Sequence, residues 1–158
     1  MSPPDAPAPG RDAPHPWSGE EHARLRALLD SGTVTLGVLM RRMNSPGSPV
    51  YSHGENIIPA AAVLSVSFTA AAVLHHLAGA ALLGLGCAWW WWRVRPQIRA
   101  AVHARTRAHV LEDPRQMDVQ WARGAITLFA RMPDGSERLA RRRDDWRAYV
   151  RSFHPDHR

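Results

Sequence analysis

The sequence predicts a membrane α-helical protein: a two-helix transmembrane hairpin, a small cytoplasmic α+β module and a disordered proline-rich amino terminus. Two observations predict this fold class. Residues 57–92 are 36 consecutive positions without Asp, Glu, Lys or Arg, whereas about 20 apolar helical residues suffice to cross a bilayer core. The stretch ends in aromatic and basic residues, which are typical anchors at the membrane–water interface. The six expected anchors are Trp89, Trp90, Trp91, Trp92, Arg93 and Arg95.

The amino-terminal flank divides into a tail and a structured segment. Residues 1–17 contain six prolines and few apolar side chains, so we expect them to be disordered. A cytoplasmic segment over residues 18–56 should follow. Ser18 and Glu21 have the spacing of a capping box, which predicts a helix that ends near Asp30.

The rest of this segment is less regular. Residues 33–43 fit either a strand or an interfacial helix, because alternating threonine and valine favour the first and the spacing of leucine and methionine favours the second. Residues 44–56 contain two prolines and two glycines, and they predict a loop that leads into the membrane.

The length of the uncharged stretch favours two helices over one. A single helix of 36 residues would extend about 54 Å, against about 30 Å of hydrocarbon in a bilayer. Two helices over residues 57–92, joined by a tight turn, fit this thickness better. We place the turn at His75 and His76, the most polar pair in the stretch. The alternative is a single span, which would put residues 1–56 on the opposite side of the membrane from the carboxyl terminus.

Small residues recur at helical spacing in both halves of the stretch. Such ladders let two helix backbones approach closely in lipid, where packing drives association. The abundance of alanine also produces ladders by chance, so they are compatible with a hairpin and do not require one. They are candidate packing positions, within the hairpin or against another membrane subunit. The first half contributes Ala61, Ser65 and Thr69, and the second contributes Ala80, Gly84 and Ala88.

The charge distribution predicts the orientation. Residues 93–158 carry 15 Arg against eight acidic residues, a net charge of +7, whereas residues 1–56 carry five Arg against six acidic residues, a net charge of −1. By the positive-inside rule the carboxyl side lies in the cytoplasm, and a hairpin keeps the amino side there as well. A basic segment in this position is attracted to anionic lipid headgroups.

The composition points to an origin rather than an activity. All 20 basic residues are arginine and alanine is abundant, which indicates a GC-rich bacterial genome and therefore a bacterial inner membrane. Cys87 is the single cysteine, which excludes an internal disulfide and a cysteine-cluster metal site.

Residues 93–158 predict a basic α+β module. Alternating apolar residues and strong turn signals indicate a three-stranded meander between two helices. A module of this size is near the lower limit for an independent core, so we expect it to lean on the membrane, the amino-terminal helix or a partner. The predicted elements are a helix to residue 111, strands at 117–121, 126–132 and 137–141 with a turn at 133–136, and a last helix capped by Asp144.

His75 and His76 are the first candidates for chemistry, because neutral imidazole is a common metal ligand. Haem held between spans needs histidines at matched depths on two helices, and residues 57–92 contain no other histidine. We therefore expect these residues to form the turn, with no cofactor, no metal site and no catalytic residue. The sequence also lacks a glycine-rich phosphate loop, a nucleophile elbow and a His-Glu-x-x-His motif.

Several arginines outside the aromatic anchors are candidate contacts for lipid or a partner protein. The triplet at 141–143 could bind phosphate, but Asp144 and Asp145 follow it directly and cancel much of its field. No aromatic residues interleave these arginines as they do in single-strand binders, so nucleic acid is not an expected partner. The candidate contacts are Arg99, Arg105, Arg107, Arg141, Arg142 and Arg143.

The tripeptide His154-Pro155-Asp156 is similar to the signature of J-domain co-chaperones, which implies stimulation of a partner ATPase. The similarity covers only the end of the sequence. The residues before it are predicted as strands, where a J-domain has its first helix, so we do not expect a co-chaperone.

Together these features predict a small bacterial integral inner-membrane protein without catalytic activity. It would act as an accessory or assembly subunit, or as a membrane-tethered interaction protein, with anionic lipids and other membrane subunits or a second copy as partners. One alternative is a lipid-sensing module, because a hairpin followed by a small β-domain resembles bacterial membrane-anchored PH-like proteins in architecture. The other is a haem- or metal-binding redox or transport subunit that uses His75 and His76.

Overall fold

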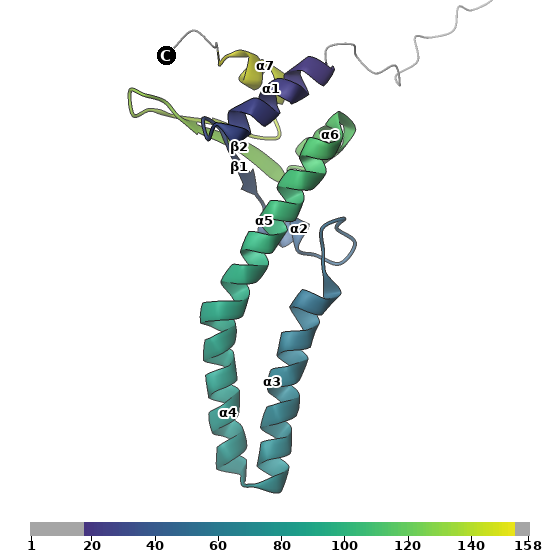
Figure 1. Cartoon of the computed structure of the whole chain (residues 1–158), viewed down its shortest axis with the longest axis vertical. Helices are drawn as coiled ribbons and strands as arrows, with labels where there is room; N and C mark the ends of the chain where they lie inside the picture. The colour runs from purple at the N-terminus through teal and green to yellow at the C-terminus, as the bar shows by residue number, and fades with distance from the viewer. Residues whose placement is uncertain (1–17, 154–158) are drawn as a thin grey trace, which may run out of the picture.

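The computed structural model describes residues 18–153, which form a head and a long helical arm (Figure 1). The head contains residues 18–50 and 95–153, and the arm contains residues 53–94. The predicted tail at 1–17 and the tripeptide His154-Pro155-Asp156 lie outside the described residues.

The arm consists of two antiparallel helices. Helix α3, His53–Val73, runs away from the head, and α4, His76–Trp89, returns to it. A π-helical segment, η1, Trp90–Val94, continues directly into α5, Arg95–Glu112, which enters the head. The turn predicted at His75 and His76 is confirmed, since α3 ends just before it and α4 begins at His76.

The predicted fold class, with its two-helix transmembrane hairpin over residues 57–92, is wrong. Among residues 18–153, α3 is the one helix long and apolar enough to cross a membrane. Helix α4 has 14 α-helical residues before the π-helical segment begins, fewer than the roughly 18 consecutive apolar residues of a candidate spanning helix. The uncharged stretch predicts an α-helix that continues to Trp92. In the structure the α-helical hydrogen-bonding pattern ends at Trp89, because the π-helical segment begins at Trp90. The observed architecture is an α+β head that carries one helical arm.

The head is built around a three-stranded antiparallel sheet with the order β1-β2-β3. Strand β1, Thr35–Val38, precedes the arm, whereas β2, Ile126–Arg131, and β3, Glu137–Ala140, follow it. Strand β1 pairs with β2 so that Leu36 faces Leu128. The sheet therefore joins the two ends of the arm in one structure.

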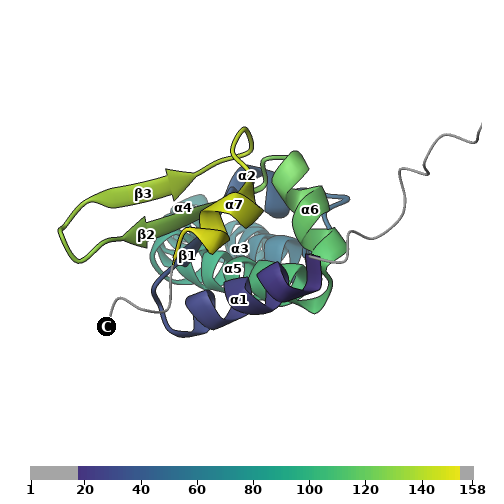
Figure 2. The same ribbon diagram turned by 90° about the horizontal axis from the view of Figure 1, so that it is seen from above.

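Three helices cover the sheet: α1, Ser18–Asp30, α6, Pro114–Ala122, and α7, Trp146–Arg151. Viewed along the arm, they lie together while the β2–β3 hairpin extends away from them (Figure 2). The helices and the sheet enclose the main core, whose largest fully buried side chains include Trp146, Leu25, Met117, Ile126 and Leu128. The α+β module thus leans on the amino-terminal helix, as expected, because its own residues are too few for a core.

A second, smaller core joins the arm to the head. It contains Met43 from α2, Met40–Met43, and Val50 from the loop that follows. Both belong to one buried cluster with apolar residues of the helix that leaves the arm, Val94, Ile98 and Val102. Residues 33–43, which fitted either a strand or a helix, supply both: β1 and then α2.

The predicted three-stranded meander after the arm is also wrong, because its first strand, at 117–121, does not form. Residues 117–121 lie in helix α6 and not in a strand. Asp113 caps this helix by accepting a hydrogen bond from the Arg115 N–H at 2.8 Å, and Pro114 occupies its first turn, where a missing N–H costs nothing. Met117 and Trp121 are buried on one face, which is the spacing of a helix. Strand β1 takes the missing place in the sheet.

Two other predictions near the carboxyl end are close to the structure. The turn at 133–136 is confirmed, because the Met132 N–H donates to the Ser136 carbonyl at 2.8 Å and closes it. The last helix forms, but Asp145 caps it and not Asp144, by accepting a hydrogen bond from the Arg147 N–H at 2.9 Å. The Asp144 carboxylate instead accepts one from the Arg141 N–H.

Candidate functional site

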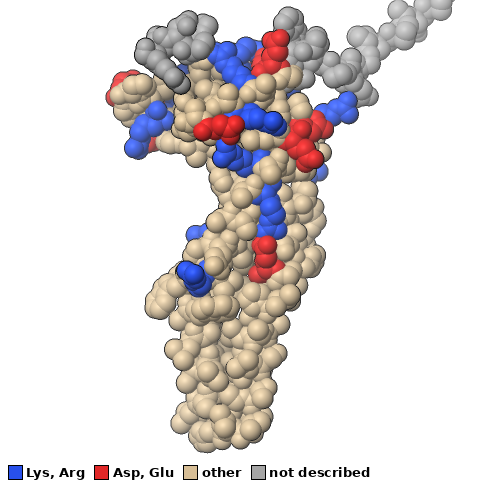
Figure 3. All heavy atoms as spheres, in the orientation of Figure 1, with Lys and Arg blue, Asp and Glu red and all other residues tan. Residues whose placement is uncertain are grey.

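The surface of the arm is apolar and almost entirely exposed. Only 11% of the most apolar 18-residue window of α3 is buried within the molecule. Phe68 on α3 and Leu85 on α4 expose 71% and 68% of their surface. Figure 3 shows charged atoms over the head and near the base of the arm, and none on this face of the distal arm. An exposed apolar surface this large marks a site of contact with lipid or protein.

Two glycines of α4 hold the arm together. A Cβ atom added to Gly79 would lie 2.5 Å from the Ala71 Cβ and 2.7 Å from the Ser67 carbonyl oxygen. One added to Gly86 would lie 2.3 Å from a methyl group of Val63. The two helices therefore approach so closely that only glycine fits at these positions.

The six small residues that the sequence singled out lie elsewhere on the arm. Ala61, Ser65 and Thr69 are exposed on α3, and so are Ala80 and Gly84 on α4. Ala88 is half-buried, and a Cβ at Gly84 would meet nothing within 4 Å. The seven-residue spacing of Gly79 and Gly86, two turns of one helix face, is the signal that would have identified the packed face.

His75 and His76 form the exposed tip of the arm. The His75 Nδ1 accepts a hydrogen bond from the Leu77 N–H at 3.3 Å and so caps α4. The two imidazole rings are 3.9 Å apart at their centroids. Within residues 18–153, no group of three or more His, Cys, Asp or Glu side chains is close enough together to hold a metal ion.

The four tryptophans at the other end of the arm point in different directions. Trp89, Trp91 and Trp92 are exposed, while Trp90 is half-buried and packs against the second core. The Arg95 guanidinium lies 4.1 Å from the centroid of the Trp91 ring, a cation–π contact. Arg93 is exposed. These six residues lie together at the base of the arm and are called the belt below; their role as membrane anchors stays a prediction.

A pocket of about 440 Å³ opens beside this belt, between α2, α3 and the start of α5. Met40, Trp90 and Ile98 supply its apolar wall. Asn44 and Asn56 also line the pocket and hydrogen-bond each other through both side-chain amides. This pair ties the end of α2 to the first turns of α3.

Three arginines form the basic wall of the same pocket: Arg41, Arg95 and Arg99. Arg99 was a predicted lipid contact and Arg95 a predicted anchor, whereas Arg41 was in neither group. Within the described part of the chain, no carboxylate forms an ion pair with any of the three. Their charge is thus available to a ligand.

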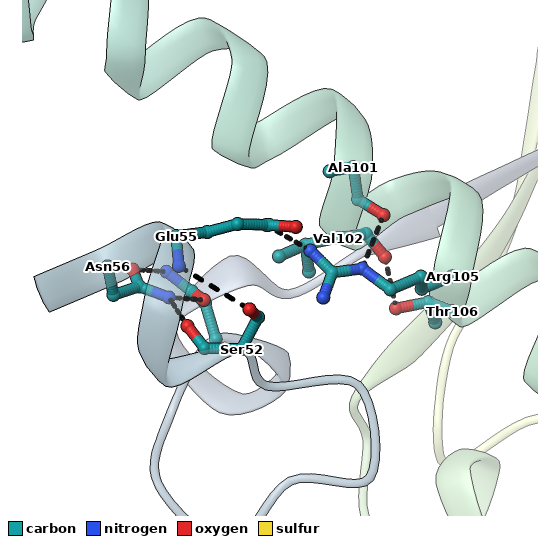
Figure 4. A network of polar contacts seen from close by, with 8 residues as sticks. Ser52, Glu55, Asn56, Ala101, Val102, Arg105 and Thr106 are labelled. Atoms are coloured by element: carbon teal, nitrogen blue, oxygen red, sulfur yellow. Dashed lines mark hydrogen bonds and ion pairs between the residues drawn. The ribbon is translucent and has the colours of Figure 1, made fainter. Parts of the chain in front are cut away.

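Two other predicted lipid contacts on α5 have partners inside the protein. Arg105 forms an ion pair with Glu55 of α3, and its Nε donates to the Ala101 carbonyl at 3.3 Å (Figure 4). Arg107 forms an ion pair with Asp30 of α1 at 2.6 Å. Both pairs are partly solvent-exposed, so each contributes about 0–1 kcal/mol to stability. They link α5 to the first turn of α3 and to the last residue of α1.

The predicted contacts Arg141, Arg142 and Arg143 lie in the exposed turn between β3 and α7. The structure does not bring them into the pocket at the base of the arm.

A cluster of partly buried charges in the head was not anticipated. Glu21 of α1 is 7% exposed and forms ion pairs with Arg147 and Arg151 of α7. Arg147 also contacts the Asp118 carboxylate of α6 at 2.6 Å, and the Trp146 indole donates to the same carboxylate at 2.9 Å. The cluster joins three helices that are distant in sequence, so no local pattern could reveal it.

Comparison of the chain with protein-family models, curated proteins and solved structures found no match.

Proposed function

We propose that this chain is a bacterial inner-membrane protein without catalytic activity, held in lipid by the apolar arm and acting through its basic head. Its role would be that of an accessory or assembly subunit, or of a tethered interaction protein. The exposed apolar surface of the arm is the observation that carries the proposal.

The energetic argument starts from the large apolar side chains on the arm. Burying one fully is worth roughly 1.5–3 kcal/mol. The arm exposes many large apolar side chains between Ile57 and Trp92. Leaving their exposed surface in water costs on the order of 15 kcal/mol in total. That equals or exceeds the whole stability of a typical domain, about 5–15 kcal/mol. Lipid removes this cost without any change in the fold.

The head supports an orientation in which both flanks of the arm are cytoplasmic. Strand β1 precedes the arm and β2 follows it, and they pair in one sheet. A single span with residues 1–56 on the far side would separate these strands. Both flanks of the arm would therefore lie on the same side of the membrane, and α3 is the one helix of spanning length among residues 18–153. The net charge of +7 after the arm agrees with a cytoplasmic head.

The protein would meet two kinds of partner. Anionic headgroups fit the arginines at the base of the arm, and a protein subunit, or a second copy, fits the exposed small residues of α3 and α4. The arginines at 141–143 are followed by Asp144 and Asp145, which offset two of their three charges, so the loop does not support nucleic acid as a partner.

Membrane fractionation tests the anchoring. The full chain, produced in a bacterium, should remain with membranes after washing with high salt and alkaline carbonate. F68R/L85R places two charges on the apolar arm, at about 2.5–3.5 kcal/mol each in the bilayer centre, and should release the protein. V119R/L139R is the matched control, because these head residues are 41% and 44% exposed. Recovery of the unmodified chain in the detergent-free supernatant would refute the proposal.

The two roles are distinguished by purification in mild detergent. A stoichiometric membrane partner supports the accessory role. A clean monomer that binds anionic vesicles with strong salt dependence supports the tethered role instead.

A further inference from the structure

The pocket at the base of the arm combines apolar and basic side chains. It is open, it lies where the apolar surface of the arm meets the charged surface of the head, and its walls differ in character. Its lining includes three apolar side chains, Met40, Trp90 and Ile98, and three arginines. A ligand that fits must therefore be amphipathic and anionic.

The arginines come from two helices, one before the arm in the sequence and one after it. Arg41 belongs to α2, before the arm, whereas Arg95 and Arg99 lie one turn apart on α5, after it. No carboxylate of residues 18–153 neutralises them. Arginine presents several N–H donors in a planar fork that matches phosphate oxygens. Three guanidinium groups at one pocket therefore favour a ligand that carries phosphate and a net negative charge.

Hydrogen bonds join two of the elements that form the pocket. Asn44 Nδ2 donates to Asn56 Oδ1 at 2.9 Å, and Asn56 Nδ2 donates to Asn44 Oδ1 at 3.0 Å. The Asn56 amide donates as well to the Ser52 carbonyl at 2.8 Å. These bonds fix α2 against α3, and Trp90 packs on the second core. A preformed site loses little entropy when the ligand binds.

The π-helical segment η1 lies at this point of the chain, Trp90–Val94. Such segments are rare and occur frequently at functional sites. Trp90 packs inward at the pocket while Trp91 lies outside under the Arg95 guanidinium, 4.1 Å from its ring centroid. That contact directs Arg95 while leaving its other N–H donors free.

From this geometry we infer that one anionic phospholipid binds in the pocket, with its headgroup phosphate held by Arg41, Arg95 and Arg99 and its acyl chains along the arm. The inference rests on the proposed function, since it requires the base of the arm to lie at the level of lipid headgroups. It adds a specific lipid class and a stoichiometry of one phospholipid per chain. Basic pockets beside membrane helices on the cytoplasmic side bind anionic headgroups in the same way.

Native mass spectrometry of the full chain, released from non-ionic detergent, tests the inference. Phosphatidylglycerol, cardiolipin, phosphatidylcholine or inorganic phosphate is added in turn. We expect one retained phosphatidylglycerol or cardiolipin per chain, at least about tenfold tighter than phosphatidylcholine. Phosphatidylcholine has the same phosphate, but its choline cation cancels the headgroup charge and is repelled by the three arginines. Inorganic phosphate should not compete, because it cannot use the apolar wall. Competition by inorganic phosphate at the same concentration would overturn the lipid assignment.

Matched variants connect the lipid to the pocket. R41Q/R95Q/R99Q should lower the affinity for the anionic lipid by about tenfold or more. R115Q/R131Q/R138Q removes the same charge from other parts of the head and should retain it. If the first variant fails to fold by circular dichroism, R41Q/R99Q replaces it, since both side chains are exposed. Equal retention by the pocket variant and the control would overturn the inference.

Failure of this inference is distinguishable from failure of the proposed function. Fractionation of the same variants reports whether the arm still holds the chain in membranes. A chain that stays in the membrane but retains no anionic lipid refutes the pocket alone, whereas a chain found in the supernatant refutes the anchoring.

Discussion

The side-chain amides of Asn44 and Asn56 hydrogen-bond each other in both directions, at 2.9 and 3.0 Å. Asn44 ends α2 in the head, and Asn56 lies near the start of α3 in the arm. The pair therefore sets the position of the arm on the head. It also lines the basic pocket at their junction.

Replacing Asn56 with alanine should destabilise this junction. The change removes both amide bonds and leaves the half-buried Asn44 without its partner, which costs about 1–3 kcal/mol. Thermal unfolding in detergent measures the loss. In a double-mutant cycle with N44A, the two changes should cost less together than the sum of the separate costs. Strict additivity would show that the pair does not couple the arm to the head.

Glycine substitutions on α4 test how closely the arm is packed. G79A and G86A each place a Cβ inside 2.6 Å of an α3 atom, at Ala71 and Val63, and should cost about 1–3 kcal/mol. G84A is the matched control, because its Cβ meets nothing within 4 Å and alanine favours helix. Limited proteolysis and thermal unfolding in detergent give the comparison. Equal effects of the three changes would contradict the observed helix contact.

The charge cluster of the head gives a third prediction. R147M should cost about 2–4 kcal/mol, because it leaves the buried Glu21 carboxylate with one ion-pair partner fewer and removes the partner of Asp118. R131M breaks an exposed ion pair with Glu137, 2.9 Å long, and should cost less than about 1 kcal/mol. Chemical denaturation followed by tryptophan fluorescence measures the free energy of unfolding of both variants. A cost for R147M no larger than for R131M would show that the cluster is not a buried network.

The turn at 133–136 predicts a local pH effect. Hydrogen bonds from the Ser136 hydroxyl and then from its N–H lower the pKa of the Asp134 carboxyl below its usual value. Because the folded pKa is lowered, the stabilisation is present above the unfolded pKa and is lost as the pH falls through the folded pKa. In an NMR titration, S136A should raise the pKa of Asp134 toward the usual value. An unchanged pKa in S136A would exclude the hydroxyl as the main cause.

Much of the helical content could be predicted from local pattern. The capping spacing that starts at Ser18 and the polar pair at His75 and His76 are local signals, because caps and turns depend on a few consecutive residues. The last helix was predicted for the same reason, with an error of one residue in its cap. Residues 117–121 were misassigned because alternating apolar residues over a short window also fit a helix with two buried positions one turn apart.

Sequence alone determined that an uncharged apolar stretch exists, that it turns at its midpoint and that arginine dominates after it, because these are properties of consecutive residues. Tertiary structure decided where α4 ends, which glycines face α3 and how the arm joins the head. It also decided that β1 and β2, separated by the whole arm, share one sheet. The physical reason is that close packing and ion pairing depend on atoms brought together from distant segments, as Arg41 meets Arg95 and Arg99 at one pocket.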